Sequence, residues 1–433
     1  MDFEIKKNIL IIAYAYPPNN VAGAQRPHAL AKYLDKAKYN VKVITCKNPD
    51  LPMGENLDFD PHIDGVELIQ VKSKIGSSAS KLRQNNQIKS NIKILSKLKL
   101  FLFKTAQRLI FPDKGMFWYP EVKSFLKKNN ELVKNTDVIF STSPGVTNHR
   151  IASFIKKQNS KAKWIADFRD FNYVEHWEFK SGIKAILHKK LEASIIRKAD
   201  EVTFVTQTMQ KAYQKFYPKH DQKMHCVYNG FDKSDFPEMV QQLRDTEKLS
   251  FFYAGSFYNG LRSPFPLMQL VDKAIQDKIL STDDIQIRIA GNIEEDIKQQ
   301  MERFESNQCV NFLGSIPRTE VIKQMSEATF LWLIVANIKA HYQTIPIKIF
   351  EYIAARKLIV NFAPAAAESS QIIEANNLGF NFDTLEFNLE EAYIDFTQLV
   401  SDFKNGYYNK PLPVENLDSF VWDNQIKLIE NLF

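Results

Sequence analysis

Short apolar runs alternate with stretches of helical periodicity along this chain, and that alternation limits the possible folds more than any other feature. Residues 8–14 (NILIIAY) form one such run, residues 24–34 have a helical pattern, and residues 41–45 are apolar again. Strands covered on both faces of a parallel sheet have continuous apolar runs of this kind, because neither face meets water. The opening of the chain therefore predicts a strand, a helix and a second, parallel strand.

The alternation restarts after a polar stretch at residues 232–248. A chain of 433 residues is also longer than one ordinary hydrophobic core supports. We therefore predict an α/β fold of two doubly wound, Rossmann-like domains in tandem. Ligands of such sheets bind beyond the carboxyl ends of the strands, so the loops that follow the strands form the predicted site. Further strands are predicted at residues 137–141, 162–167, 201–205, 250–254, 286–290, 310–313, 329–334 and 358–361.

The composition is that of a soluble globular protein, with 44% hydrophobic and 25% charged residues. The three cysteines, Cys46, Cys226 and Cys309, are too far apart to indicate a disulfide framework or a zinc site. No apolar run reaches the roughly 18 residues of a membrane span, and the first run is too short for a signal peptide. These features predict a cytoplasmic protein without a transmembrane helix.

The net charge of +7 comes from one segment, residues 68–112, which holds ten lysine and arginine residues and no acidic residue. Apolar residues recur there at intervals of three or four, which predicts an amphipathic helix with a basic face. Such a helix is typical of proteins that bind an anionic membrane surface. The alternative to a membrane-binding helix is a helix whose apolar stripe faces the protein core. Nucleic-acid binding is not indicated, because the segment has no recognised nucleic-acid-binding motif. The stripe consists of Ile88, Ile92, Leu95, Leu98, Leu102, Ala106 and Leu109.

The loop after the first predicted strand has the sequence YPPNNVAGAQR, residues 16–26. Gly23 allows the backbone to approach a ligand closely at the start of a helix, and Arg26 lies in the first turn of that helix. A single glycine before a helix is also ordinary turn chemistry. Both interpretations of this loop therefore stay open.

Loops in the second half of the chain have similar chemistry. Ser256 and Arg262 follow the strand at 250–254, and a guanidinium can bind phosphate oxygens in bidentate fashion. Gly291 and Gly314 each occupy the first position beyond a predicted strand, where a side chain would block a bound base or ribose. A lone surface arginine is the alternative interpretation of Arg262.

Residues 345–360 (IPIKIFEYIAARKLIV) place two opposite charges in an apolar segment. Pro346 suits the first turn of a helix, and Lys348 and Glu351, three positions apart, share one face of it. An ammonium at a helix N-terminus favours phosphate, and a carboxylate beside it can accept hydrogen bonds from a ribose. The segment therefore indicates a nucleotide site, with a self-satisfied ion pair as the alternative.

Taken in order, these motifs resemble those of a GT-B fold glycosyltransferase of the family 4 type, in the bacterial branch that builds surface polysaccharides and lipid-linked glycans. The resemblance covers nearly the whole chain and depends on the ordered set rather than on one motif. The motifs are YPPNNVAGAQR (16–26), TSPGVTNH (142–149), ADFRD (166–170), NGFD (229–232), AGSFYNGLRSP (254–264), IRIAG (287–291), VNFLGSIPR (310–318) and PIKIFEYIAARKLIV (346–360).

The resemblance implies two Rossmann-like domains that face a central cleft: an acceptor-binding domain at 1–231 and a nucleotide-sugar-binding domain at 249–413. A helix at 414–433 would cross back to the first domain. The implied activity is retaining transfer of a hexose from a UDP- or GDP-sugar to a glycan or lipid-linked acceptor, without a metal or other cofactor. The implied catalytic residues are Asp170, His149, Arg262 and Lys348. The implied donor-binding residues are Gly23, Arg26, Ser256, Gly291, Ile316, Gln343, Lys348 and Glu351.

Two departures from the family pattern bear on catalysis. Many relatives carry two glutamates eight positions apart, and the first of these positions is Gln343 here, which lacks the charge. Many also carry a histidine directly after the strand at 137–141, where this chain has Thr142 or Ser143. His149 lies further along, and Asp170 is the stronger candidate for a contact to sugar or acceptor.

Three functions therefore remain: a transferase at the inner leaflet of the cell membrane, a nucleotide-sugar epimerase of the same fold, and a non-catalytic peripheral membrane protein with that fold. An epimerase needs acid and base groups around the sugar, whereas the basic segment favours the transferase. Binding of a nucleoside diphosphate separates the enzymes from the non-catalytic alternative. The donor sugar, base, acceptor and linkage depend on a few loop contacts and are not predicted.

Overall fold

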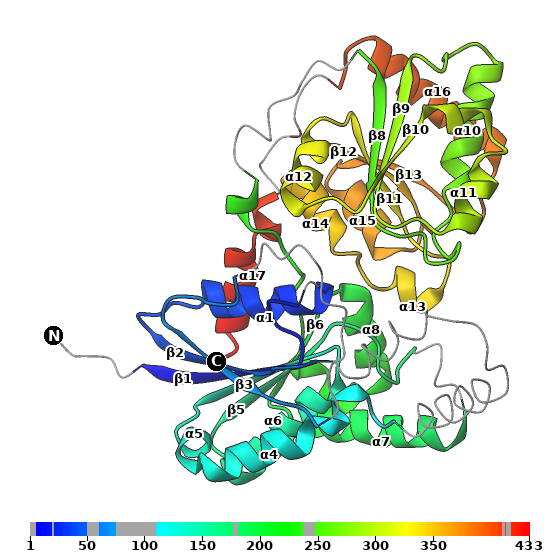
Figure 1. Cartoon of the computed structure of the whole chain (residues 1–433). Helices are drawn as coiled ribbons and strands as arrows, with labels where there is room; N and C mark the ends of the chain where they lie inside the picture. Colours follow the sequence, from blue (N-terminus) through cyan, green and yellow to red (C-terminus); the bar gives the residue numbers. More distant parts are fainter. Residues whose placement is uncertain are drawn as a thin grey trace, which may run out of the picture. The chain divides into compact units, whose positions relative to one another are not determined.

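The computed structural model describes residues 6–19, 21–49, 60–74, 110–175, 181–236, 247–408, 412 and 417–433. The chain divides into two compact units (Figure 1). Unit 1 consists of Met1–Tyr228 together with Gln425–Phe433, and unit 2 consists of Asn229–Asn424. Each unit is built around its own parallel sheet.

The sheet of unit 1 has seven strands in the order β3-β2-β1-β4-β5-β6-β7, and neighbouring strands run parallel. The chain winds outward from β1 to β3 and then continues on the other side of β1 with β4. The winding direction therefore reverses between β1 and β4, the position where open α/β sheets bind ligands. The strands are Lys7–Ala13 (β1), Tyr39–Cys46 (β2), Val66–Val71 (β3), Val138–Thr142 (β4), Lys163–Phe168 (β5), Glu201–Phe204 (β6) and Met224–Cys226 (β7).

Helices cover both faces of this sheet, with α1 and α17 on one side and α4, α6 and α7 on the other (Figure 1). Two fully buried tryptophans, Trp118 and Trp164, anchor the core beneath α4 and α6. Each ring N–H has a buried acceptor, so the rings are buried without an unpaired donor. The helices are Ala22–Tyr33 (α1), Lys114–Phe117 (η1), Tyr119–Lys128 (α4), Asn130–Lys134 (α5), Val146–Gln158 (α6), Gly182–Lys198 (α7), Gln207–Phe216 (α8), Pro218–Lys223 (η2) and Trp422–Glu430 (α17).

The sheet of unit 2 has six parallel strands in the order β10-β9-β8-β11-β12-β13, and its winding reverses between β8 and β11. Its strands are Leu249–Ala254 (β8), Ile285–Ala290 (β9), Val310–Gly314 (β10), Phe330–Ile334 (β11), Leu358–Phe362 (β12) and Gly379–Phe382 (β13). Its helices are Lys233–Asp235 (η3), Phe265–Gln276 (α10), Glu295–Met301 (α11), Glu305–Cys309 (η4), Arg318–Ser326 (α12), Lys339–Tyr342 (α13), Lys348–Ala354 (α14), Glu368–Ala375 (α15), Leu389–Lys404 (α16) and Leu417–Phe420 (η5).

The predicted α/β fold of two doubly wound, Rossmann-like domains is confirmed, and each predicted strand is present within a few residues of its predicted bounds. The prediction missed β3, β7 and β13, three of the four outermost strands, which are short or lack a continuous apolar run. Most of the basic segment at 68–112 lies outside the described residues. None of the helices in the described part of the chain is long and apolar enough to span a bilayer.

Candidate functional site

Two glycines shape the carboxyl edge of the unit 2 sheet. Gly255 follows β8 with φ of +148°, and Gly291 follows β9 with φ of +129°. Both values lie in the region that favours glycine. A Cβ at Gly255 would collide with the Lys348 Nζ atom, and a Cβ at Gly291 would collide with the Gly255 backbone. The missing side chains therefore let the Lys348 ammonium lie directly against the loop after β8.

Lys348 begins α14, and its Nζ atom lies 4.4 Å from the centre of the Tyr253 ring. Burial, reinforced by Arg262 and partly opposed by Glu351, lowers the pKa of Lys348 to about 7. Arg262 itself lies over the Tyr258 ring, at 4.5 Å from the ring centre. The structure therefore brings together the three residues that the sequence predicted as the centre of a nucleotide site, Lys348, Arg262 and Glu351.

Ser256 has a different environment from the one predicted. Its hydroxyl donates to Glu294 Oε1 at 2.9 Å and accepts from the Tyr258 amide at 3.0 Å. Glu294 also accepts from the Asn259 amide at 3.1 Å. These bonds hold the loop that presents Arg262, so in this structure Ser256 orders the loop.

Glu351 has a partner that the sequence analysis missed. Arg318, the first residue of α12, donates through Nη1 to Glu351 Oε1 and through Nη2 to Asp235 Oδ2, the latter at 2.8 Å. Arg318 was part of the motif VNFLGSIPR, but nothing local to that motif indicated its partners. The distance in sequence between the three residues explains why the pairing went unpredicted.

The two remaining donor-site predictions in unit 2 follow strands of the same sheet. Ile316 lies two residues after β10 and is partly buried. Gln343 follows α13, in the connection that leads from β11 to α14, and is also partly buried. Both therefore belong to loops at the edge that carries Gly255 and Lys348.

His149, predicted as a catalytic residue, is instead a residue of the unit 1 core. The side chain is completely buried on α6, and its ring lies 4.7 Å from that of Phe168. Trp164 donates to Ser141 Oγ at 2.8 Å, so the Ser141 hydroxyl is free to donate to His149 Nδ1, also at 2.8 Å. Burial lowers the pKa of His149 to about 4. His149 is therefore a neutral core residue.

Arg26, predicted as a donor contact, is likewise a buried structural residue. Its side chain is 1% exposed and forms an ion pair with Asp167 at 2.9 Å, while Nη1 donates to the Tyr228 carbonyl. Asp167 also accepts from the hydroxyls of Thr142 and Thr203. Burial raises the pKa of Asp167, but Arg26 and the hydroxyl donors outweigh that effect and hold the pKa below its usual value. The pair joins α1 to the centre of the sheet.

Asp170 and Gly23 lie near Arg169 at the carboxyl edge of the unit 1 sheet. A Cβ at Gly23 would come within 3.2 Å of Arg169 Nη2, so the start of α1 packs closely against that guanidinium. Burial outweighs the opposing effects of Asp167 and Asp170 and lowers the pKa of Arg169 to about 10. Asp170 is exposed. Of the unit 1 predictions, Asp170 is therefore the side chain that a ligand can reach.

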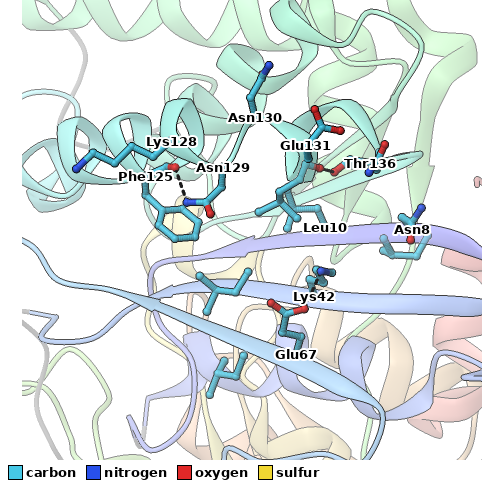
Figure 2. Close-up of a pocket in the computed structure, with 15 residues that line it drawn as sticks. Asn8, Leu10, Lys42, Glu67, Phe125, Lys128, Asn129, Asn130, Glu131 and Thr136 are labelled. Atoms are coloured by element: carbon cyan, nitrogen blue, oxygen red, sulfur yellow. Dashed lines mark hydrogen bonds and ion pairs between the residues drawn. The ribbon is translucent and has the colours of Figure 1, made fainter.

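A separate cavity of about 800 Å³ lies between strands β1 to β3 and helices α4 and α5 (Figure 2). Phe125 and the Lys42–Glu67 ion pair, whose charged atoms are 2.7 Å apart, contribute to its lining. None of the predicted site residues lines it. Among the described residues, no group of three or more His, Cys, Asp or Glu side chains is arranged to hold a metal ion.

No family model and no curated protein sequence matches the chain, but solved structures do. A sucrose-phosphate synthase from Thermosynechococcus elongatus aligns with a TM-score of 0.63 and 13% identity over 99% of this chain and 98% of that one. WaaG, a glycosyltransferase involved in lipopolysaccharide biosynthesis, aligns with a TM-score of 0.56 and 15% identity over 98% of this chain and 95% of that one. A Listeria monocytogenes protein assigned as a UDP-N-acetylglucosamine 2-epimerase aligns with a TM-score of 0.51 and 10% identity over 99% of this chain and 96% of that one. The chain has the GT-B fold of these proteins.

Proposed function

We propose that the protein is a retaining glycosyltransferase that moves a sugar from a nucleoside-diphosphate donor to a glycan or lipid-linked acceptor in the synthesis of a cell-surface polysaccharide. The observation that carries this proposal is the group formed by Lys348, Arg262 and Glu351 around Gly255. Two cations and a carboxylate at the carboxyl edge of a Rossmann-like sheet match the charges of a diphosphate and the hydroxyls of a ribose. The solved glycosyltransferases of the same fold support the choice of reaction.

The proposed roles of these residues follow from the position at which negative charge develops during the transfer. When the bond between the sugar and the donor breaks, negative charge accumulates on the leaving diphosphate. Preorganised cations at that position stabilise the transition state more than the ground state. Lys348 and Arg262 supply these cations, while Glu351 accepts hydrogen bonds from the ribose. UDP and GDP are the nucleotides we propose, and a hexose is the transferred sugar.

A thermal-unfolding panel with UDP, GDP, dTDP and the corresponding sugars tests the proposal. A ligand that binds only the native state raises the unfolding midpoint, and a concentration a hundred times the Kd stabilises by about 2.7 kcal/mol. We expect at least one nucleotide to raise the midpoint of the wild type and to have a much smaller effect on Glu351→Ala. A panel in which no nucleotide shifts the midpoint contradicts the proposal.

An epimerase is the second candidate, because the Listeria structure has the same fold. The two reactions differ in what happens to the donor in the absence of an acceptor. An epimerase converts the sugar of the donor to its epimer, whereas a transferase leaves the sugar configuration intact. Proton NMR of each nucleotide sugar incubated with the protein alone distinguishes them, and we expect no epimer to form.

Binding of the diphosphate is expected to weaken as the pH rises above neutrality. The pKa of Lys348 is about 7, so the ammonium is lost in the empty site at alkaline pH, whereas a bound diphosphate favours the charged form. Binding at about pH 8 should therefore take up a proton. Calorimetry in two buffers of different ionisation enthalpy measures this uptake, and Lys348→Met should abolish it. Equal proton uptake in both proteins contradicts the role of Lys348.

Turnover is expected to be independent of divalent metal. The proposed cations are side chains, so no metal is needed to neutralise the leaving group. With the nucleotide sugar identified in the binding panel, the rate of nucleoside-diphosphate release in excess EDTA should equal the rate in magnesium or manganese. A rate that falls to background in EDTA and returns with added metal contradicts this proposal.

The basic segment at 68–112 is proposed to dock the protein on the anionic inner leaflet of the cell membrane. Each lysine near such a surface contributes about 1 kcal/mol, and the attraction weakens with salt. Replacement of Lys93, Lys97, Lys99 and Lys104 by glutamine should release the protein from anionic vesicles in a sedimentation assay.

The control for this experiment removes four exposed lysines of unit 1 that lie outside the segment. Because both variants lose the same charge, the difference between them reports the position of the charges. Binding by the control variant should stay close to that of the wild type, and equal release of both variants contradicts the proposal. The control residues are Lys127, Lys128, Lys134 and Lys161, each replaced by glutamine.

A further inference from the structure

Arg318 connects two carboxylates of unit 2 that come from distant parts of the chain. Its guanidinium donates to Glu351 on α14 and to Asp235 on η3, at 2.8 Å for the second bond. The side chain is 26% exposed, and those of Glu351 and Asp235 are 16% and 33% exposed. The three residues therefore form a partly buried network in which one planar guanidinium donates to two carboxylates through different nitrogens.

The network occupies only one of the two oxygens of Glu351. Oε1 accepts from Arg318, while no residue in the described part of the chain donates a hydrogen bond to Oε2. A carboxylate can accept further bonds at that atom. Glu351 is thus held through one oxygen, and the other can still accept a hydrogen bond.

The position of Glu351 relative to Lys348 indicates which part of the ligand would meet the carboxylate. Glu351 follows Lys348 by one turn of α14, and Lys348 Nζ lies against the Gly255 backbone. A ligand with an anionic group at Lys348 would therefore present its adjoining hydroxyl-bearing part to Glu351. In a nucleoside diphosphate that part is the ribose.

We infer that Arg318 is a positioning residue for the recognition of ribose, which acts by fixing the Glu351 carboxylate with one oxygen directed to the ligand. This inference depends on the proposed nucleotide site. A free glutamate side chain has several rotamers, and binding would have to select one of them. Because Arg318 already holds the carboxylate, and Asp235 already holds Arg318, that selection is made before the ligand arrives.

Arg318 also alters the charge of the site. An unpaired Glu351 carboxylate would repel a diphosphate nearby, whereas the Arg318 guanidinium offsets its charge. Lysine would keep the charge but, as a compact point charge, would not bridge both carboxylates. Orientation of the Glu351 carboxylate therefore requires arginine at position 318, whereas any cation there would compensate the charge of Glu351.

Calorimetric titration with two probes separates positioning from direct contact. The first probe is whichever of UDP and GDP the wild type binds, and the second is inorganic pyrophosphate, which has no ribose. We expect Arg318→Ala to weaken nucleotide binding about tenfold or more, the effect of losing an oriented bond to a charged group. We expect pyrophosphate binding to weaken by a clearly smaller factor, because the lost charge compensation affects both probes whereas the lost orientation of Glu351 affects only the nucleotide. Arg318→Lys should bind the nucleotide with intermediate affinity.

A double-mutant cycle with Glu351→Gln provides the second readout. If Arg318 acts through Glu351, its replacement should have little further effect once the carboxylate is gone. Asp235→Asn should weaken nucleotide binding less than Arg318→Ala, because Arg318 still reaches Glu351. Unfolding midpoints of each variant show that the fold persists, and Arg318→Lys serves if the alanine variant does not fold.

The outcomes distinguish the inference from the function on which it depends. If the wild type binds neither nucleotide, the proposed function fails and the inference fails with it. If the wild type binds and Arg318→Ala binds equally well, only the inference is wrong. Equal losses for nucleotide and pyrophosphate would show that Arg318 acts only on the phosphates, by its charge or by direct contact. Additive losses in the cycle would show that it acts independently of Glu351, and either result overturns the inference.

Discussion

Replacement of Arg262 by alanine is expected to lower kcat/KM for the nucleotide sugar by a factor of about 10² to 10³, the usual effect of removing one preorganised group that stabilises transition-state charge. The guanidinium lies over the Tyr258 ring on the loop after β8 and contributes to the electrostatic environment of Lys348. Its loss removes no core volume, so the fold should persist. Steady-state kinetics at subsaturating donor measures the change.

Arg303→Ala is the matched control for this variant. Arg303 is an exposed arginine of unit 2 that lies outside the predicted site, so its replacement changes the net charge equally. We expect its kcat/KM to stay within about twofold of the wild type. Near-normal turnover by Arg262→Ala, or an equal loss in the control, contradicts the proposed role of Arg262.

Asp167→Asn is expected to destabilise unit 1 by about 3–5 kcal/mol, because it leaves the Arg26 guanidinium charged, buried and without its anion. Both side chains are almost completely excluded from solvent, with exposures of 1% and 0%. Urea titration followed by hydrogen exchange of peptides from β4 and β5 reports the free energy of unfolding of this unit.

An exposed ion pair in the same unit provides the comparison. Glu131 and Lys134 are 77% and 60% exposed and lie 3.3 Å apart. Glu131→Gln removes the same charge but should change the free energy of unfolding by less than about 1 kcal/mol. Similar effects of the two substitutions would show that the Arg26–Asp167 pair does not have the structural importance assigned to it.

The fold was predictable because its signals are local. Strands such as β1 and β8 are continuous apolar runs, since parallel strands covered by helices are buried on both faces. The missed strands are edge strands: β3 mixes polar and apolar residues, and β7 has three residues. Their pairing depends on neighbours that are remote in sequence, so a local pattern does not specify it.

The site was predictable only where it too depends on local spacing. Lys348 and Glu351 are one helical turn apart, and Arg262 follows a recognisable strand. Arg318, by contrast, is 33 residues from Glu351 and 83 from Asp235, so only the folded sheet brings them together.

Arg26 and His149 were predicted to belong to the site, but the structure places both in the interior. Each has chemistry suited to a site and lies near the carboxyl edge of the unit 1 sheet, yet each is buried. The partner of Arg26 is 141 residues away on β5. At the start of α6, residues 146–149 are all buried, so the usual rule that only one face of a helix is buried does not predict the environment of His149. Residue type and position along the chain did not reveal either environment.

Calorimetric titration of the full chain with UDP and GDP tests the central claim most directly, with Lys348→Met as the site variant and Lys357→Met as its control. Lys357 is also a buried lysine of unit 2, with a pKa that burial lowers to about 8, but it lies outside the predicted site. We predict that the wild type and Lys357→Met bind one of the two nucleotides with similar affinity, while Lys348→Met binds it at least about tenfold more weakly. Absence of binding by the wild type, or equal binding by Lys348→Met, would contradict a nucleotide-diphosphate site at Lys348, Arg262 and Glu351.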